Sequence, residues 1–465
     1  MAAFDSRIDD ARAVAETALL PDEVPPPDPD TTPVTTTVSN SYDYGGSSIS
    51  LGSSETAASI VAVAGLVQFG KNNVGVSIVS TDINRTLAAD ISGVAVDAGA
   101  GTVNAKASDG GRIAGVAVGV GVATGTFAGQ ASIVTNRIHS NTTATLGRTG
   151  TPSTATTVNA GNVNVEASTT SNIRGAAGTL AIGTQASALG VSVLTNTINQ
   201  DVTSEIRAAQ VTASGDVIVD ARSSSSIYAT AIGVAVTNAG SFGAAGSLTT
   251  NVTDNDISAR IAEGSVVAAE NNVGVHAAND DHNAVIAGSL GVSFDANGIG
   301  VSIVVSDIKG DTIAEVTGAG TQVDAKGTNA ASKLSVNTGD LASALNLGNF
   351  EAPTDNTPNL TQATRQMNGL AVTASSGQAI VSNAVTIALA ATTGTAVQLT
   401  SITSVLKGET KAAITNAAIN QNLTAGQTPE VFVGAGSHTY AGNFGFAGGT
   451  LSTNVMDRTT LAQVT

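Results

Sequence analysis

Apolar and polar residues alternate along most of this chain, in runs separated by turns rich in Gly, Asn and Ser. In residues 216–221, Val217, Val219 and Ala221 share one parity, while Asp216, Ile218 and Asp220 share the other. A period of two is typical of a β-strand, because successive side chains point to opposite faces. No long helical period occurs within residues 57–465. The pattern therefore predicts an all-β fold for this part of the chain.

One strand motif recurs and defines a repeat of about 55 residues. Its copies begin at serines that lie 55, 60, 55 and 55 residues apart, and they occupy residues 77–83, 132–138, 192–198, 247–252 and 302–308. The five extra residues follow Arg148, where residues 149–156 are expected to form an expanded loop. Within a repeat, the pattern predicts an apolar opening strand, a Gly-rich turn, the motif strand, a polar turn and a final alternating strand.

Self-similarity at a fixed period predicts a parallel β-solenoid. A single repeat cannot bury both faces of its strands, whereas stacked copies can. Parallel stacking sets equivalent residues about 4.8 Å apart, so Asn136 and Asn196 are expected to belong to a ladder of amide side chains. Two coil sizes are compatible with the repeat: about three small coils of roughly 20 residues each, or fewer and larger coils. The long opening and motif strands favour the larger coils.

One repeated position tests for recurring chemistry along the stack. The residue before the closing apolar residue of the short strand is, in successive copies, Asp90, Thr145, Glu205, Arg260, Glu315 and Ala413. This mixture predicts a position that faces solvent. If one repeat is one coil, Glu205, Arg260 and Glu315 stack with alternating charge, which stabilises an exposed site by only about 0–1 kcal/mol per pair.

The chain before residue 57 differs from the repeats. Phe4, Ile8, Ala11, Ala15 and Leu19 fall at helical spacing and Pro21 ends the run, which predicts a short N-terminal helix. The predicted organisation is a helix or arm at residues 1–20, a Pro-, Asp-, Ser- and Thr-rich linker at 21–56, and the repeat array at 57–465. The arm is either the tail of a larger protein or a cap that docks on a solenoid end.

An insertion interrupts the array at about residues 339–367. The motif spacing increases to 98 residues there, from Ser302 to Thr400, and Pro353 and Pro358 lie within the break. We expect a surface insertion, which either carries a specific binding contact or is a loop without function. The chain ends within a repeat, which predicts a fragment of a longer array or an end covered by another chain. No apolar signal segment follows Met1.

Composition narrows the function classes. The 465 residues include no Cys and no Trp, and 36 acidic against 19 basic residues give a net charge of -17. The chain therefore has neither disulfides nor thiolate metal sites, and so few bases argue against a nucleic-acid partner. Hydrophobic residues make up 42% of the chain, which argues against disorder. The stretch nearest to a membrane span, residues 113–134, is too rich in Gly, Ala and Thr to be predicted as one.

No catalytic or metal-binding motif stands out, and we assign no catalytic, cofactor-binding or metal site residues. The four histidines, His139, His276, His282 and His438, lie in different repeats and are predicted to be loop or surface residues. Paired carboxylates can hydrolyse glycosides, and the candidates are Asp216 with Asp220 and Asp280 with Asp281. A Ca²⁺ site formed by hard oxygen ligands is a further candidate, at the acidic turn expected for residues 279–283 or at Asp254 with Asp256. No other cofactor is expected.

Three segments together resemble a known family. Residues 190–196 (GVSVLTN), 141–144 (NTTA) and 215–221 (GDVIVDA) are similar to the repeats of large bacterial filamentous adhesins, the filamentous-haemagglutinin and leukotoxin-like exoproteins. The resemblance runs from about residue 57 to the end, apart from the insertion. It implies a secreted, surface-displayed, right-handed parallel β-solenoid that serves in adhesion or as a stalk, and it supplies no catalytic residues.

These observations predict a structural and interaction protein, a segment of a bacterial surface adhesin or stalk at the cell surface or in the extracellular space. The expected partners are a glycan or protein on a host or neighbouring cell, with head-to-tail self-association as a further expectation. Neither a nucleic acid nor a membrane span is expected. Two alternatives are a self-assembling subunit of an extracellular β-solenoid filament and a polysaccharide-active β-helix enzyme.

Overall fold

The computed structural model describes residues 34–38, 42–43, 49–54, 58–147, 155–239, 241–341, 362–391 and 394–465. The predicted helix at residues 1–20 and the expanded loop at 149–154 lie outside these residues, as does much of the insertion. The chain divides into two units, residues 1–32 and 33–465, and the second unit is described below.

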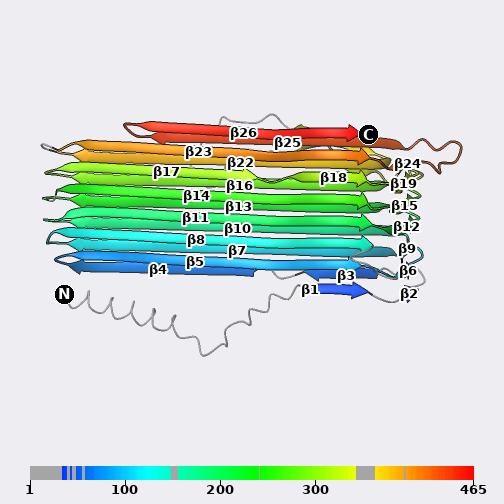
Figure 1. The fold of residues 1–465 in the computed structure, drawn as a ribbon, viewed down its shortest axis with the longest axis horizontal. Coiled ribbons are helices and arrows are strands. Elements are labelled where there is room, and N and C mark those ends of the chain that lie inside the picture. Colours follow the sequence, from blue (N-terminus) through cyan, green and yellow to red (C-terminus); the bar gives the residue numbers. More distant parts are fainter. Residues whose placement is uncertain are drawn as a thin grey trace, which may run out of the picture. The chain divides into compact units, whose positions relative to one another are not determined.

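The described residues form an all-β parallel solenoid, as predicted (Figure 1). Each coil has two long strands, which belong to two facing sheets, and one short strand, which belongs to a third sheet at one end of the long strands. Sheet A contains β1 (Val34–Val38), β5 (Asn73–Ile91), β8 (Phe127–Gly147), β11 (Ser187–Arg207), β14 (Phe242–Ala262), β17 (Asn297–Lys309), β18 (Thr312–Thr317), β23 (Ala396–Thr415) and β26 (Thr450–Val464).

The second long sheet and the short sheet complete each coil. Sheet C contains β3 (Ile49–Ser54), β4 (Ala58–Gly70), β7 (Thr102–Ala123), β10 (Asn162–Gly183), β13 (Val217–Thr237), β16 (Val273–Ser293), β22 (Gly369–Ala390) and β25 (Glu430–Phe446). The short sheet B contains β2 (Tyr42–Asp43), β6 (Ala95–Asp97), β9 (Thr156–Ala160), β12 (Ala209–Ala213), β15 (Val266–Ala269), β19 (Gln322–Ala325) and β24 (Ala418–Ile419).

One sequence repeat forms one coil, which confirms the larger of the two coil sizes. The first residues of the recurring motif pair in register along sheet A, from Ser77 to Ser132, Ser192, Ser247 and Ser302. Across the insertion, Ser302 pairs with Thr400, so the 98-residue gap still advances the stack by a single coil. Every coil therefore contacts mainly the coils before and after it, as expected for a solenoid.

The polar turns predicted inside each repeat are wrong except at residues 310–311, where the chain is interrupted between β17 and β18. Residues 187–207 form the single strand β11, and residues 162–183 form the single strand β10, so the final strand of one repeat continues into the opening strand of the next. The polar residues in the middle of these strands alternate between the interior and the surface. Inside, Gln200 donates a hydrogen bond to Ser171 across the gap between the sheets, and Ser223 donates to Gln200. A partner in the facing sheet lets a polar segment remain a strand.

The stack begins before residue 57, inside the segment predicted as a linker. Strands β1, β2 and β3 pair with β5, β6 and β7 respectively. The predicted boundary between the linker and the solenoid therefore lies within the solenoid.

The interior of each coil changes along the strand direction. We call the half of each long strand next to sheet B the base, and the half next to the turns that join β7 to β8, β10 to β11 and their equivalents the tip. The main core cluster fills the base with Ala, Val, Leu and Ile side chains from all three sheets. A column of buried isoleucines lies next to it, on the side towards the tip. Towards the tip, the interior residues of sheet C are mostly Gly, Ala, Ser and Thr.

The insertion begins and ends as an antiparallel hairpin, β20 (Leu334–Leu341) with β21 (Gln362–Met367). The hairpin packs on the outer face of sheet C, where Leu334, Val336 and Met367 contact Ala371 and Phe432. The Asn337 side chain donates to Ser375 Oγ (3.0 Å). The described ends of the insertion are thus fixed to the sheet, and residues 342–361 lie outside the described residues.

Candidate functional site

An amide ladder runs through the interior of the stack, as predicted. Asn136 Nδ2 donates to Asn196 Oδ1 (2.8 Å), and Asn196 Nδ2 donates to Asn251 Oδ1 (2.9 Å). Thr81 Oγ1 begins the ladder by donating to Asn136 Oδ1 (2.7 Å). All four side chains are buried. Asn136 and Asn196 each donate and accept along the stack, and Asn251 accepts at its end, so the ladder fixes the register between these neighbouring coils.

A second polar layer lies inside the stack and holds a buried carboxyl group. Asp281 accepts hydrogen bonds from Asn255 Nδ2 (2.6 Å) and Asn279 Nδ2 (2.7 Å). Burial raises the pKa of Asp281 to about 7, although these hydrogen bonds and His282 oppose the shift. At the N-terminal end of the same layer, Asp109 pairs with Arg85. Asp281 has no such ion pair in the described residues, so burial dominates its pKa.

We expect Asp281→Asn to remove a pH dependence of stability. A carboxyl group whose pKa is raised on folding keeps its proton in the folded state between the ordinary value of 3.8 and about 7. The folded state then binds more protons than the unfolded state, so stability falls as pH rises through this interval and stays low above it. The substituted amide would remain neutral throughout, so the variant should have the higher guanidinium midpoint at pH 8 and a smaller difference between pH 4.5 and pH 8. Asp295→Asn, which removes an exposed carboxylate in a tip turn, is the control. An unchanged pH profile in Asp281→Asn would contradict the assignment.

The carboxylate pairs proposed from sequence do not converge on a common point. Residues 279–283 belong to strand β16 rather than to a turn, and the expected acidic turn is therefore wrong. Consequently Asp281 points inward, while Asp280 points outward and pairs with His282 Nε2 (3.0 Å). Asp216 accepts hydrogen bonds from Asn271 and Asn272 at a turn, whereas Asp220 pairs with Arg222 (2.6 Å).

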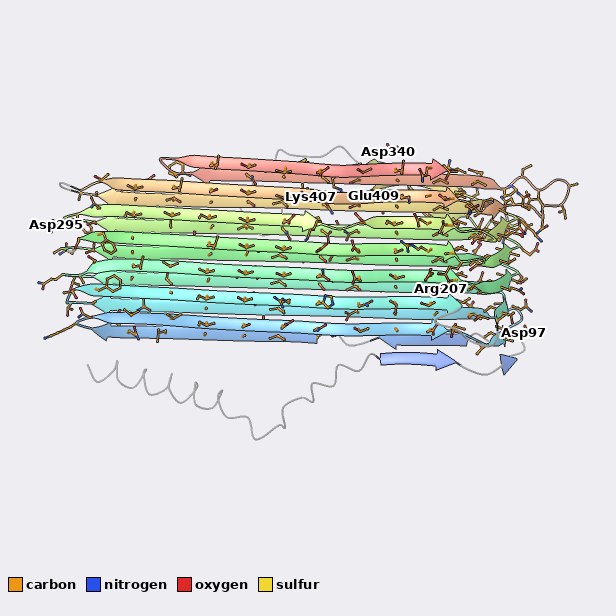
Figure 2. The ribbon with its side chains drawn as sticks, in the orientation of Figure 1. Asp97, Arg207, Asp295, Asp340, Lys407 and Glu409 are labelled. Atoms are coloured by element: carbon orange, nitrogen blue, oxygen red, sulfur yellow. The ribbon has the colours of Figure 1, made fainter. Side chains whose placement is uncertain are left out.

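Acidic residues form an outward column on sheet A. Asp201 is paired in register with Asp256, the amide of Asp311 donates to Asp256 Oδ1 (2.9 Å), and the amide of Glu409 donates to Asp311 Oδ1 (2.7 Å). Burial raises the pKa of Asp256, and the neighbouring carboxylates Asp254, Asp311 and Asp201 raise it further. Figure 2 shows Glu409 and Lys407 on this sheet between the tip and the base. Within the described residues, no group of three or more His, Cys, Asp or Glu side chains is arranged to hold a metal ion.

The column predicted from sequence stacks as expected. Asp90, Thr145, Glu205, Arg260, Glu315 and Ala413 occupy equivalent positions of successive coils. Arg260 Nε lies 3.7 Å from Glu315 Oε2, and Lys411 Nζ lies 2.6 Å from Glu315 Oε1. The pKa of Glu205 is raised by partial burial, with Arg207 opposing the shift. The prediction that this position faces solvent is wrong at Thr145 and Ala413, which are buried, and the carboxylates of Glu205 and Glu315 are partly covered.

The four histidines lie in three coils, with His276 and His282 on the same strand, β16, and they have separate partners. His139 Nδ1 bonds to Asn199 Oδ1 (2.9 Å), His276 Nδ1 to Thr373 Oγ1 (2.7 Å), and His438 Nε2 to the carbonyl oxygen of Gly339 (3.0 Å). Burial, together with Arg222, lowers the pKa of His276 to about 4, so this ring is neutral at physiological pH. His139, His276 and His438 all lie on strands rather than in loops. The hydrogen bond of His438 connects strand β25 to the hairpin of the insertion.

Sequence reasoning missed an extensive apolar surface at the tip of the coils. Both parities of the tip segments are small or apolar, and the structure turns the larger side chains outward. In β7, Gly115, Ala117, Gly119 and Gly121 face the interior, while Val116, Val118, Val120 and Val122 face outward. The signal was present in residues 113–123, where the inward parity contains only small residues after Ile113.

The tip interior is too thin for larger side chains. A Cβ atom at Gly233 would lie 2.2 Å from the carbonyl oxygen of Gly246 in the facing sheet, and one at Gly190 would lie 2.4 Å from the carbonyl oxygen of Val234. The two backbones therefore approach each other directly, and the larger apolar residues must lie on the outer surface. On sheet A the corresponding outward residues include Val191, Val193, Val301 and Ile303.

Charge is distributed in the opposite way along the strands. Most outward positions near the base of sheet A are polar or charged, such as Asp201, Glu205 and Asp256, whereas the four outward positions nearest the tip turn carry no charge in either sheet. Arg174 lies on the outer face of β10, just before these positions. Figure 2 shows Arg207 and Asp97 towards the base and Asp295 in a turn at the tip. The surface is thus divided into a charged base and two apolar tip faces.

No helix among the described residues is long and apolar enough to cross a membrane. Comparisons of this chain with models of protein families, with curated proteins and with solved structures find no match.

Proposed function

We propose that this chain is a structural and interaction protein, a segment of a bacterial surface adhesin or stalk that acts outside the cell. The observation that carries the proposal is the unbroken register of the stack, in which the coils from β5 to β23 keep equivalent residues paired. Backbone ladders in three sheets and the internal amide ladder bind each coil to the next. Such a stack resists stretching along its axis, which is the requirement for a spacer between a cell and its target.

The surface charge supports the same proposal. The net charge of -17 keeps neighbouring molecules apart through the charged base, while the insertion hairpin and the tip faces provide surfaces for selective contacts. The partners that we propose are glycans or proteins on another cell. The resemblance of the repeats to filamentous adhesins favours an adhesin or stalk. The carboxylate candidates point in different directions, which argues against a polysaccharide-active enzyme.

Binding of coated beads tests the proposal. Beads that carry the full chain are expected to adhere to surfaces presenting extracellular glycans or matrix proteins, and to remain attached in physiological salt. Beads that carry the heat-unfolded chain are the control. The proposal is wrong if no surface retains the folded chain above this control. Release of reducing sugar from the same glycans, abolished by Asp216→Asn, would instead support the enzyme.

A specific observation favours the filament subunit as a second candidate. Among the described residues, β26 pairs only with β23, and β4 pairs only with β7, so each has one unpaired edge. Both ends also expose apolar side chains, including Val63 and Phe69 on β4, and Leu451 and Val455 on β26. An open strand edge is a template for another chain, and joining of unlike ends would produce an open fibre.

Charges on the last strand should prevent such growth. We expect the chain to form filaments in a concentration-dependent manner, and Leu451→Lys with Val455→Lys to reduce filament length severalfold, because lysines on an edge strand oppose pairing with a second strand. Thr203→Lys, on the outer face of a middle coil, is the control. Electron microscopy of the unsubstituted chain, the double lysine variant and Thr203→Lys measures the filament lengths. Filaments of equal length in all three would exclude growth through β26.

A further inference from the structure

The tip face of sheet C has a regular relief that its composition alone does not show. The face comprises the outward residues of β4, β7, β10, β13, β16 and β22 nearest the tip turns, which are equivalent to Val63, Gly65, Val67 and Phe69 of β4. Thr230 and Asn383 are its polar members, and it contains no charged residue. We call this surface the ridged face.

One row of the ridged face alternates between glycine and a branched residue from coil to coil. In register, the row reads Gly65, Val118, Gly178, Ile232, Gly288 and Val385. Val118, Ile232 and Val385 are 43%, 43% and 44% exposed, because a glycine lies on at least one side of each. With coils about 4.8 Å apart, ridges recur about every 9.6 Å, and a glycine groove separates each ridge from the next.

Packing within the stack does not require glycine at the glycine positions of this row, because a side chain would have room there. A Cβ atom added at Gly65 would meet nothing within 4 Å, and one at Gly178 would only touch Val118 Cγ2 at 4.0 Å. The closest contact of a Cβ atom at Gly288 would be Ile232 Cγ1 at 3.7 Å. These glycines contrast with Gly233, which is needed because the facing backbone leaves no room. The grooves are therefore open outward.

We propose that a second copy of this chain packs its ridged face against this one, with the two stacks antiparallel and the ridges of each copy in the glycine grooves of the other. A two-fold axis along the strands, between β10 and β13, places Ile232 over the partner's Gly178, Val118 over the partner's Gly288 and Val385 over the partner's Gly65. This pairing uses every ridge and every groove from β4 to β22. Phe446 of β25, in register with Val385, lies beyond the partner's β4. Interdigitation of this kind is the usual basis of sheet-on-sheet packing.

Area and charge both favour a second copy. Six strands about 4.8 Å apart and seven residues of about 3.3 Å each give a face of roughly 650 Å², close to the about 800 Å² per partner of a standard protein interface. An apolar patch of this size is itself a mark of an interaction site. In a chain with a net charge of -17, a face without charge is where two copies approach with the least repulsion.

The same features argue against a lipid occupant. Insertion of the tip into hydrocarbon would also bury parts of the unpaired edges of β4 and β26, and each unsatisfied backbone group costs several kcal/mol there. The chain has no Trp to anchor at a membrane interface. Sheet-on-sheet packing leaves both edges in water. The contact also differs from end-to-end joining, because it uses the outer face of sheet C rather than the backbone edges of β4 and β26, so a substitution on β26 can block one association without the other.

Filling a groove tests the proposal directly. In the Leu451→Lys, Val455→Lys background, which suppresses end-to-end growth, sedimentation velocity is expected to show a monomer–dimer equilibrium. Gly178→Val should weaken the dimer at least tenfold without lowering the unfolding midpoint, and Ile232→Ser should weaken it similarly. Gly246→Val is the matched control, because it adds the same side chain to the outer face of sheet A, where the nearest atom to its Cβ is 3.9 Å away.

Cross-linking provides a second measurement in a chain without cysteine. With Ile232→Cys, a short bismaleimide is expected to link two chains, whereas Thr203→Cys, on the outer face of sheet A, should give none. A chain that stays monomeric at its highest soluble concentration, or dimers that Gly178→Val leaves as stable as before, would overturn the proposal. Flotation with neutral phospholipid vesicles that is lost in Ile232→Ser, without any dimer, would also overturn it and assign the face to lipid.

Discussion

Asn196→Asp is expected to destabilise the solenoid by about 3–5 kcal/mol at pH 8, the usual cost of an uncompensated charge in a protein interior. Asn196 is fully buried, and it joins Asn136 to Asn251 by donating and accepting within one ladder. A carboxylate can accept from Asn136 Nδ2, but it cannot donate to Asn251 Oδ1. With Asn251 in its present orientation, two acceptors would then face each other, and one of them would be charged. If Asn251 turned its unpartnered Nδ2 towards the carboxylate, the charge would still be fully buried.

The loss of stability in Asn196→Asp should become smaller as the pH falls. Burial would raise the pKa of the new carboxyl group in the folded state, so the folded chain would bind a proton that the unfolded chain releases, and stability would increase towards low pH. Once protonated, the group donates one hydrogen bond and accepts another, much as asparagine does. Guanidinium midpoints at pH 5 and pH 8, each compared with the unsubstituted chain, measure the difference. This comparison at equal pH removes the contribution of Asp281.

Asn199→Asp is the control on the same strand. Asn199 lies three residues away, faces outward and contacts the His139 ring, so a carboxylate there is solvated or paired. We expect a change in midpoint within the range of ordinary surface substitutions, about 0.5 kcal/mol. Equal losses in both variants would mean that the ladder is not the source of the stability.

Gly233→Ala should cost about 3 kcal/mol, a large effect for one methyl group. The added Cβ would lie 2.2 Å from the carbonyl oxygen of Gly246 and 3.0 Å from that of Gly190, and both obstacles are backbone atoms of the facing sheet. A flexible side chain could move aside, but here two sheets would have to separate against their own packing. The expected result is a lower guanidinium midpoint together with faster hydrogen exchange in the tip segments of β13 and β14, because overpacking is relieved by local displacement.

Gly178→Ala is the matched substitution with the opposite expected sign. Gly178 lies in the neighbouring strand β10 and faces outward, with no atom closer than 4.0 Å to a new Cβ. Replacing glycine at an unstrained position removes freedom from the unfolded chain and stabilises the fold by about 0.4–1 kcal/mol. Similar midpoints for Gly233→Ala and Gly178→Ala would contradict the close approach of the two sheets at the tip.

The repeat and its register were fixed by residues that can be read along the chain. The serines at 77, 132, 192, 247 and 302 predicted which residues become neighbours, and the structure pairs them in that order. Asn136 and Asn196 were predicted to stack for the same reason. Register follows from period alone, because parallel stacking places equivalent positions of successive copies side by side whatever the shape of the coil.

Local pattern was insufficient wherever the partner of a segment lies in another sheet. Polar residues such as Gln200 and Asp281 predict turns when they are considered with their sequence neighbours only. In the structure they lie inside continuous strands, since the facing sheet supplies Ser171 and Ser223 to Gln200, and Asn255 to Asp281. The early start of the stack at β1 has a similar origin, because short strands with weak patterns are held by pairing with β5.

By itself, the sequence determined the strand period, the repeat length and the equivalence of positions between coils, because these depend only on residue spacing. Only the tertiary structure decided which parity of the tip faces inward. In residues 115–122 both parities are apolar, and the usual expectation puts valine inside. The sheets approach so closely at the tip that only glycine and other small residues fit between them. The valines therefore form an outer surface, and the distance between the two facing sheets determines this result.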